Sequence, residues 1–171
     1  MKTRYVYLGR FAPFHNGHRA LLSRAIEKWG ADSVLLMIGS TNTLNKRTPY
    51  TYEDRRLIIR ASFPNLEILP IPDGKPNLEH FDGSTNGEWL DSIDKIALER
   101  EERFVFLGGS KEDLEVLSER FETIVLIDRT EKKISATEVR EMIKTNNTLE
   151  LKKVVDPSAI EIIIERFKKF I

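Results

Sequence analysis

The sequence predicts an α/β fold in which helices cover both faces of a parallel β-sheet. Short apolar runs of strand length alternate with helical patterns along the chain, as a doubly wound sheet requires. The length of 171 residues fits one domain built around one core. Neither an internal repeat nor a linker interrupts the pattern, so we expect residues 1–171 to form a single domain that ends in a helical segment.

The expected strands are short apolar runs bounded by residues that favour turns. The run Ser33-Val-Leu-Leu-Met-Ile-Gly39, for example, is of strand length and ends at a glycine. Strands are expected at residues 5–9, 33–39, 66–70, 104–107 and 123–127.

The expected helices begin at recognisable capping residues. Thr51 and Asp54 resemble a capping box, and the Asp156-Pro157 pair suits the N-cap and the first position of the last helix. Helices are expected over residues 16–29, 51–62, 88–100 and 110–120, from Ser135 onward and from Asp156 onward.

The loops that follow the strands are the expected place for a ligand. In open parallel sheets, ligands bind beyond the carboxyl ends of the strands. The loop over residues 72–87 is rich in Gly, Pro and Asn and is long enough to indicate a functional role. The segments expected to meet at this rim are residues 9–18, 39–47, 72–87, 108–110 and 133–140.

Composition excludes several classes of protein and partner. Lys and Arg total 27, as do Asp and Glu, so the chain lacks the basic excess typical of non-specific nucleic-acid binders. The absence of cysteine excludes disulfides and thiolate metal sites, and it suits a cytoplasmic location. No apolar run approaches the ~20 residues of a membrane span, and Met1 leads into a charged strand rather than a signal peptide.

The most informative segment is Gly9-Arg-Phe-Ala-Pro-Phe-His-Asn-Gly-His18, which joins the first strand to the first helix. A helix N-terminus attracts phosphate, to which His15, His18 and Arg10 can donate hydrogen bonds, while Gly17 lets a ligand approach the backbone. Two histidines at this spacing also fit a metal site or a packed helix cap. A metal site usually needs a third ligand, and His80 has no neighbouring Cys or His.

A second motif, Ile134-Ser-Ala-Thr-Glu-Val-Arg140, opens a later helix. Ser135 suits the N-cap, Thr137 lies in the first turn, and Arg140 follows one turn later on the same face. Two hydroxyls and a guanidinium at a positive helix end suit a polyphosphate. Taken alone, this motif is an ordinary capped amphipathic helix.

Together, the two motifs resemble the signatures of the HxGH nucleotidylyltransferase superfamily, which has a Rossmann-like fold. The Gly-Arg-Phe-x-Pro-Phe-His form is similar to the archaeal-type nicotinamide-nucleotide adenylyltransferases, although Ala12 stands where those often have Gln. The segments 49–55 and 71–73 resemble family segments, and Asn86-Gly-Glu-Trp89 resembles the family's N-x-x-W. The resemblance covers nearly the whole chain.

This resemblance implies an enzyme that joins nicotinamide mononucleotide to the AMP moiety of ATP, giving NAD and pyrophosphate, with Mg²⁺ accompanying the ATP. The residues that it assigns to catalysis are His15, His18 and Arg140. Those assigned to ATP and its phosphates are Gly9, Arg10, Phe11, Gly17, Gly108, Ser135 and Thr137. Asn86 and Trp89 are assigned to the acceptor, and no metal-ligating residue is assigned.

Two alternatives stay open at this stage. One is another adenylyl- or cytidylyltransferase of the same superfamily with a different acceptor phosphate. The other is a non-catalytic sensor of NAD or ATP, although intact His15, His18 and Arg140 argue against loss of the chemistry. Class I aminoacyl-tRNA synthetases share the H-x-G-H motif, but this chain is too short and too neutral to handle tRNA. The resemblance also makes self-association an expectation.

Overall fold

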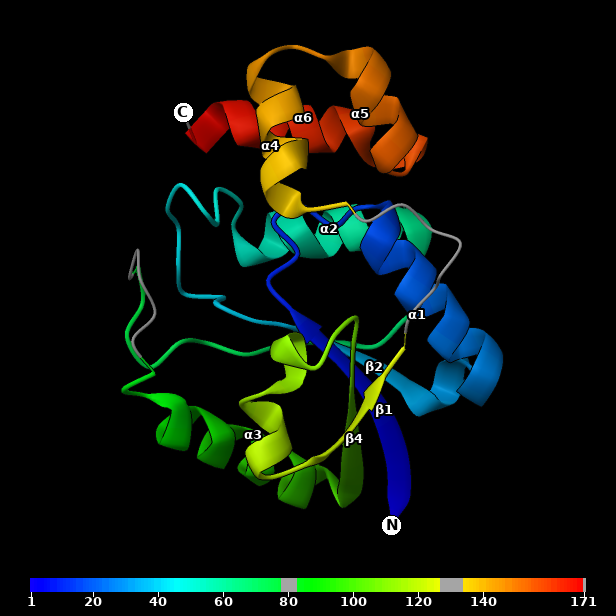
Figure 1. Ribbon diagram of the computed structural model, residues 1–171, viewed down its shortest axis with the longest axis vertical. Helices are drawn as coiled ribbons and strands as arrows, with labels where there is room; N and C mark the ends of the chain where they lie inside the picture. Colours follow the sequence, from blue (N-terminus) through cyan, green and yellow to red (C-terminus); the bar gives the residue numbers. More distant parts are fainter. Residues whose placement is uncertain (78–82, 127–133, 171) are drawn as a thin grey trace.

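A parallel β-sheet forms the centre of the computed structural model, which describes residues 1–77, 83–126 and 134–170 (Figure 1). Within these residues the strand order is β3-β2-β1-β4-β5, and every neighbouring pair is parallel. The strands are β1 (Lys2–Gly9), β2 (Val34–Ile38), β3 (Ile68–Pro70), β4 (Glu102–Gly108) and β5 (Glu122–Val125). The predicted Rossmann-like, doubly wound fold is confirmed.

Helices connect the strands, and further helices follow the sheet. The α-helices are α1 (Asn16–Trp29), α2 (Tyr52–Ser62), α3 (Asn86–Arg100), α4 (Ala136–Lys144), α5 (Thr148–Val154) and α6 (Ile160–Phe170). Short 3₁₀ turns are η1 (Ala31–Ser33), η2 (Glu112–Leu114), η3 (Leu117–Glu119) and η4 (Pro157–Ala159). In the described parts of the chain, none of the helices has the length and apolar character needed to cross a bilayer.

The two faces of the sheet carry separate hydrophobic clusters. Along β2, Leu36 and Ile38 point into one cluster, whereas Leu35 and Met37 point into the other, because successive strand side chains alternate in direction. Helices α1 and α2 cover the first cluster. Helix α3 and the turns η2 and η3 cover the second. All five residues of β2 are buried, as expected for a parallel strand with both faces covered.

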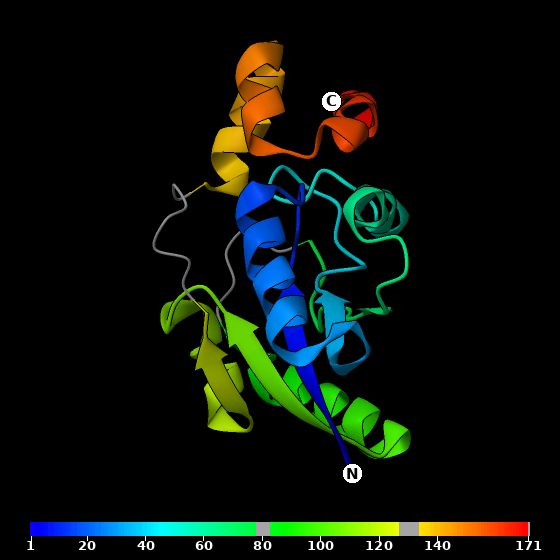
Figure 2. The same ribbon diagram turned by 90° about the vertical axis from the view of Figure 1, so that its right-hand side faces the viewer.

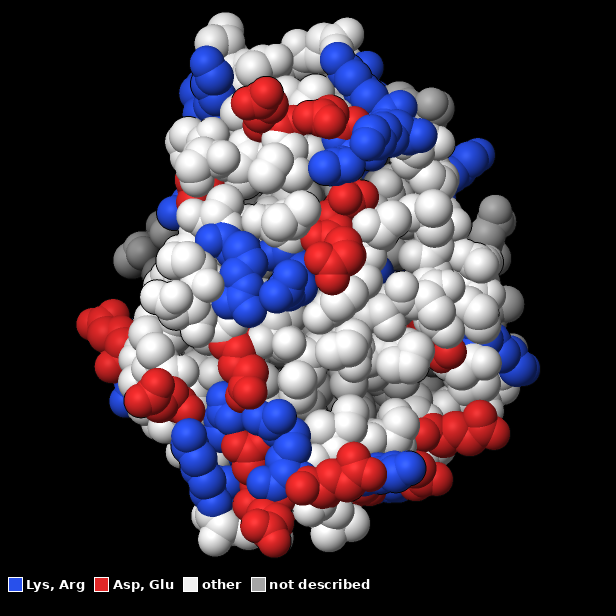
Figure 3. Space-filling model, turned by 180° about the vertical axis from the view of Figure 1, so that it is seen from behind, with Lys and Arg blue, Asp and Glu red and all other residues white. Residues whose placement is uncertain are grey.

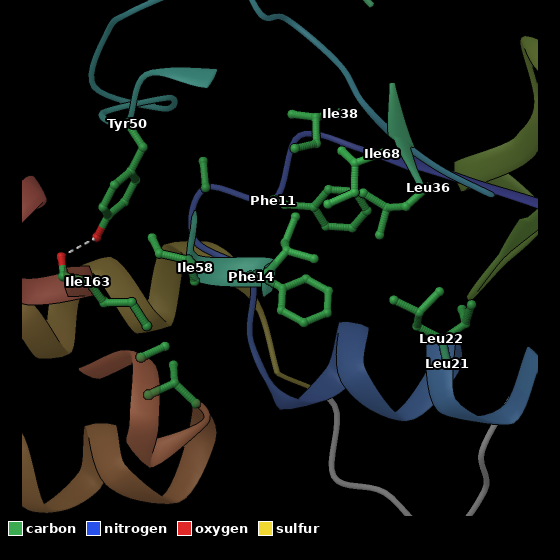
Figure 4. Packing of buried hydrophobic residues seen from close by; sticks show 14 of the residues in the cluster. Phe11, Phe14, Leu21, Leu22, Leu36, Ile38, Tyr50, Ile58, Ile68 and Ile163 are labelled. Atoms are coloured by element: carbon green, nitrogen blue, oxygen red, sulfur yellow. Dashed lines mark hydrogen bonds between the residues drawn. The ribbon is translucent and has the colours of Figure 1, made fainter. Parts of the chain in front are cut away.

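The C-terminal helices extend the first cluster beyond the sheet. They lie past α2, at the opposite end of the molecule from the N-terminus (Figures 1 and 2). Ile163 and Phe167 of α6 are buried in the same cluster as Phe11 and Phe14 of the loop after β1. The Tyr50 hydroxyl donates a hydrogen bond of 2.8 Å to the carbonyl of Ile163, which ties the segment before α2 to α6 (Figure 4).

One predicted helix is wrong. Residues 110–120 form the short turns η2 and η3 in place of a continuous α-helix. Leu114 and Leu117 are both buried, and a spacing of three residues places them on one side of a 3₁₀ path. The N-cap of η2 is Lys111, and the hydroxyl of the preceding Ser110 accepts a hydrogen bond from the backbone N–H of Asp113 at 3.2 Å.

Other boundaries differ by small amounts. Helix α3 begins at Asn86, so the end of the predicted 72–87 loop is helical, and α5 is a separate helix that the sequence pattern did not indicate. Strand β3 begins at Ile68 and β5 ends at Val125. Residues 78–82, which include His80, and residues 127–133 lie outside the described part of the chain.

Ion pairs join the strands at the end of the sheet where the strands begin. Arg4, which is 5% exposed, donates hydrogen bonds of 2.8 Å to Glu67 and to Glu102, and Arg100 bonds to the same two carboxylates. Elsewhere, on the face opposite to that of Figure 1, basic and acidic side chains are interspersed (Figure 3). That distribution agrees with the equal numbers of basic and acidic residues.

At the carboxyl ends of the strands, a buried arginine holds two loops together. Arg55 of α2 is fully buried and donates hydrogen bonds to the backbone carbonyls of Arg10 at 3.1 Å, Gly39 at 2.7 Å and Ser40 at 2.9 Å. It forms no ion pair with any carboxylate in the described residues. Burial and the neighbouring Arg10 lower the pKa of Arg55 to about 10, so its guanidinium remains charged at neutral pH. This one side chain therefore joins the loops that follow β1 and β2.

Replacing Arg55 by Met removes the donor from all three carbonyls, of which that of Ser40 is in a buried contact and the other two are in partly buried ones. Because buried acceptors that lose their partners are costly, we expect Arg55→Met to lower the free energy of unfolding by about 3 kcal/mol or more. Chemical denaturation would measure this. Arg56→Met is the matched control, since Arg56 makes only an exposed pair with Glu53 at 3.5 Å and should cost less than about 1 kcal/mol. Equal losses in the two variants would contradict the role given to Arg55.

Candidate active site

A pocket of about 600 Å³ lies beyond the carboxyl ends of the central strands. The ends of β1, β2 and β4 form its floor through Leu8, Gly9, Gly39, Leu107 and Gly108. Loops and helix starts form its walls. Because the strand order reverses between β1 and β4, this is the place where a doubly wound sheet binds its ligands. The pocket thus occupies the rim that the sequence predicts.

The two histidines of the first motif also cap helix α1. His15 is the N-cap residue, and its Nδ1 atom accepts a hydrogen bond from the backbone N–H of Gly17 at 3.1 Å. His18 Nδ1 accepts from the backbone N–H of His15, also at 3.1 Å. Because both Nδ1 atoms serve as acceptors, each neutral ring carries its proton on Nε2. The capping arrangement therefore fixes which ring nitrogen can donate to a ligand.

Burial keeps both rings neutral at pH 7. It lowers the pKa of His15 to about 4, and the pKa of His18 falls well below its usual value because of burial and the neighbouring His15. The rings stack with centroids 3.6 Å apart, and Phe11 and Phe14 pack against His18. His18 lines the pocket, whereas His15, at 4% exposure, lies behind it. The two rings are therefore neutral, packed against each other, and each carries an Nε2–H donor.

Two glycines of this motif make room for side chains of the protein itself. A Cβ atom on Gly17 would lie 2.9 Å from Cε1 of His15, so any larger residue would displace the capping ring. A Cβ on Gly9 would lie 2.8 Å from the ring of Phe11. The close approach expected at Gly17 is therefore made by His15. Gly17 does not line the pocket, although Gly9 and Phe11 do.

Three arginines converge on the pocket. Arg10, Arg47 and Arg140 all line it. Burial lowers the pKa of Arg10 and of Arg140, and the positive charge of Arg47 lowers both further, which indicates that the three cations lie close together. The side chains of Arg10 and Arg47 make no hydrogen bond or ion pair with another described residue. Such a concentration of positive charge favours an anion with several negative groups, such as a polyphosphate.

The second motif joins the first through Arg140. Its guanidinium donates one hydrogen bond of 2.8 Å to the carbonyl of Ala12, in the loop after β1, and another of 3.2 Å to the Thr137 hydroxyl. Ser135 caps α4 as predicted, because its hydroxyl accepts from the backbone N–H of Glu138 at 3.1 Å. Thr137 lines the pocket, while Ser135 lies outside its lining. Segments far apart in the sequence thus share one wall.

The start of α3 forms a further wall of the pocket. Asn86 and Trp89, both predicted acceptor residues, line it together with Thr85. Trp89 is half-buried and also packs against the cluster on the α3 face of the sheet, so it serves the core as well as the pocket. The Oδ1 atom of Asn86 is buried and has no hydrogen-bond partner. Because this oxygen has almost no accessible surface, a ligand would reach it only after the Asn86 side chain turns toward the pocket.

Hydrogen bonds join the loops after β2 and β3 beside this wall. The Asn42 side chain bonds to the backbone of Asp73 in both directions, at 2.8 and 2.9 Å, and the Thr43 hydroxyl donates to the Asp73 carboxylate at 2.9 Å. Asp73 and Thr43 also line the pocket. These hydrogen bonds hold the two loop segments together beside the pocket.

The end of β4 completes the pocket. Gly108 lines it together with Val116 and Leu117, but a Cβ on Gly108 would lie 2.8 Å from Leu114. The glycine is therefore required by the packing of Leu114, and its assignment to ATP binding remains a prediction.

Most of the predicted site residues come together. Those in the pocket lining are Gly9, Arg10, Phe11, His18, Asn86, Trp89, Gly108, Thr137 and Arg140, while His15, Gly17 and Ser135 support the wall from behind. Three further residues, Arg47, Asp73 and Arg55, were not assigned to the site from the sequence. Arg47 and Asp73 line the pocket, and Arg55 is fully buried. Asp73 and Arg55 lie in the segments 71–73 and 49–55 that resemble family segments, and this resemblance was the available signal for them. Arg47 had no such signal, because a basic residue in a loop is usually solvated.

Comparison with known proteins assigns the chain to a class. The cytidylyltransferase-like family matches residues 6–142, and the chain belongs to that family. Among curated relatives, the nicotinamide-nucleotide adenylyltransferase of Methanocorpusculum labreanum is 37% identical over 79 residues, covering 43% of this chain and 46% of the relative. That of Methanosarcina barkeri is 36% identical over 80 residues, covering 44% and 45%. The matched stretch spans less than half of the length of these relatives. The resemblance to nicotinamide-nucleotide adenylyltransferases that the two sequence motifs predicted is confirmed.

Solved structures show the same fold. A bifunctional NMN adenylyltransferase/ADP ribose pyrophosphatase from Francisella tularensis, complexed with AMP and a Mn ion, has a TM-score of 0.64 at 24% identity. This likeness covers 85% of this chain and 42% of that one. The Plasmodium falciparum nicotinic acid mononucleotide adenylyltransferase, complexed with NaAD, has a TM-score of 0.66 at 15% identity and covers 96% of both chains.

The low pKa of His15 predicts a pH dependence of stability. Between the unfolded value of ~6.5 and the folded value of about 4, the unfolded chain binds a proton that the folded chain does not, so acid destabilises the fold through this residue. In His15→Asn the cap is kept but the titrating group is lost. We expect the free energy of unfolding of this variant to gain ~2 kcal/mol relative to wild type between pH 7 and pH 5.

Denaturant titrations at the two pH values measure this difference, and the wild type supplies the reference for all other titrating groups. If the stabilities of the two proteins change in parallel with pH, His15 titrates normally and its ring is not held as described.

Proposed function

We propose that this protein is an adenylyltransferase that joins nicotinamide mononucleotide to the AMP moiety of ATP, giving NAD and pyrophosphate. The observation that carries the proposal is the convergence of neutral His18 with Arg10, Arg47 and Arg140 on one pocket beyond the central strands. The curated relatives from Methanocorpusculum labreanum and Methanosarcina barkeri are named nicotinamide-nucleotide adenylyltransferases. Trp89 and Asn86 supply a flat wall and a free acceptor for the nicotinamide ring.

The chemistry needs no general base, since the attacking phosphate of the acceptor is already an anion. It would attack the α-phosphorus of ATP in line, and pyrophosphate would leave. The Nε2–H group of His18, fixed by its backbone contact, would stabilise the charge that develops on the phosphates, and His15 would keep that ring in place. Arg10, Arg47 and Arg140 would hold the two substrates at the reacting distance.

The proposed metal ion enters with the nucleotide. Mg²⁺ usually keeps several of its waters and binds substrate phosphates, so a dedicated cage of protein ligands is unnecessary. Mg²⁺ bound in this way would neutralise phosphate charge, and the F. tularensis structure holds a Mn ion. Self-association and a cytoplasmic location remain predictions.

A panel of acceptors tests the substrate. With ATP and Mg²⁺, nicotinamide mononucleotide should yield a dinucleotide and pyrophosphate faster than phosphopantetheine, flavin mononucleotide or glycerol 3-phosphate, as measured by product mass. Faster reaction of any of the other three would refute the proposed acceptor and spare the adenylyl transfer. Binding of nucleotide without any product would favour the alternative of a non-catalytic sensor.

Arg140 allows a sharper test of the phosphate wall. Its guanidinium bonds to Ala12 and Thr137 while it faces the pocket, and an ammonium group cannot reproduce such a planar set of donors. We expect Arg140→Lys to lower kcat/KM for ATP at least about tenfold, because Lys retains only part of the electrostatic stabilisation. Steady-state kinetics measure this, with melting curves as the control for folding. Kinetics at the wild-type level would remove Arg140 from the site.

A further inference from the structure

We infer that Lys75 is a specificity-determining residue for the acceptor and that it binds the polar substituent of the acceptor's ring. As a result, the pocket takes a nicotinic acid mononucleotide, with its carboxylate, as well as the carboxamide form. This inference rests on the proposed function. It concerns a residue that neither sequence motif includes, in the loop between β3 and α3.

Lys75 stands at the wall that carries the other two acceptor residues. It lines the same pocket as Asn86 and Trp89. Its Nζ atom donates a hydrogen bond of 2.8 Å to the hydroxyl of Ser84, just before α3. The adjoining backbone is closely docked, because a Cβ on Gly74 would lie 2.9 Å from the side chain of Thr85. The ammonium group is therefore held beside the first turn of α3.

The charge of Lys75 is available for a ligand. Lys75 makes no ion pair with a carboxylate of the described residues. The nearest acidic residue of the pocket lining in sequence is Asp73, whose carboxylate already accepts from the Thr43 hydroxyl at 2.9 Å. Thr85, the N-cap of α3, makes no side-chain capping bond, so the partial positive charge of this 15-residue helix adds to that of Lys75.

These groups match both forms of the ring substituent. With the ring against Trp89 and the Asn86 side chain turned toward the pocket, a carboxamide donates to the Oδ1 atom of Asn86, which has no partner within the protein, and accepts from Lys75. A carboxylate accepts from Lys75 and from Nδ2 of Asn86, once the Asn86 amide turns by half a rotation. The hydrogen bond from Lys75 is charge-assisted on both sides only with the carboxylate. Loss of the Lys75 charge should therefore harm the acid form more than the amide form.

The test compares the two mononucleotides directly. Lys75→Gln keeps a hydrogen-bond donor and removes the charge. Lys46→Gln is the matched control, because Lys46 is an exposed cation of a loop that borders the pocket but does not itself line it. With ATP and Mg²⁺, wild type should convert both forms. Lys75→Gln should lower the ratio of kcat/KM for the acid to kcat/KM for the amide by about tenfold, and Lys46→Gln should leave it within about twofold.

An unchanged ratio in Lys75→Gln, an equal fall in the control variant, or a wild type that rejects the acid form would each overturn the inference. If wild type makes no dinucleotide from either acceptor, the proposed function fails separately, and calorimetric titration of the two mononucleotides then decides. Selective loss of binding of the acid form in Lys75→Gln would still support the inference. Equal losses, or no binding of either mononucleotide to wild type, would overturn it.

Discussion

The hydrogen bonds of Arg55 to three backbone carbonyls are the interaction on which the pocket depends. The loops after β1 and β2 leave the sheet side by side, and their carbonyls at Arg10, Gly39 and Ser40 point to one buried spot. The Arg55 guanidinium donates to all three carbonyls at once. Its positive charge lies close enough to that of Arg10 for the two to repel each other. The position of the Arg10 backbone, and hence of its side chain in the pocket, follows from this contact.

The H-x-G-H string combines two tasks that are usually separate. Its histidines cap α1 through their Nδ1 atoms, and the same contacts orient the Nε2–H groups, so helix geometry and donor geometry cannot vary independently. Gly17 is fixed by this arrangement as well, since the His15 ring occupies the space of its Cβ. The residues of the motif therefore stabilise the start of α1 whether or not a ligand is bound.

Sequence patterns predicted the features whose causes are local. The capping box at Thr51, the alternation of apolar runs and the two motifs each depend on neighbouring residues, and they were found in the structure. Spacing could not distinguish an α-helix from 3₁₀ turns around Leu114 and Leu117, because both conformations bury residues three apart. Nor could it show that Arg55 points inward, or that Arg47 and Asp73 reach the pocket, since those positions depend on tertiary contacts.

The separation of the hydrophobic clusters divides the pocket into two independently supported halves. The start of α1 and the helix that carries Arg140 rest on one cluster, whereas Trp89 and the start of α3 rest on the other, across the sheet. A change in the packing beneath α3 would therefore act first on the half that carries Trp89. Under the proposed function, such a layout would let related proteins change the acceptor that they join to a nucleotide while they retain the residues that bind the nucleotide.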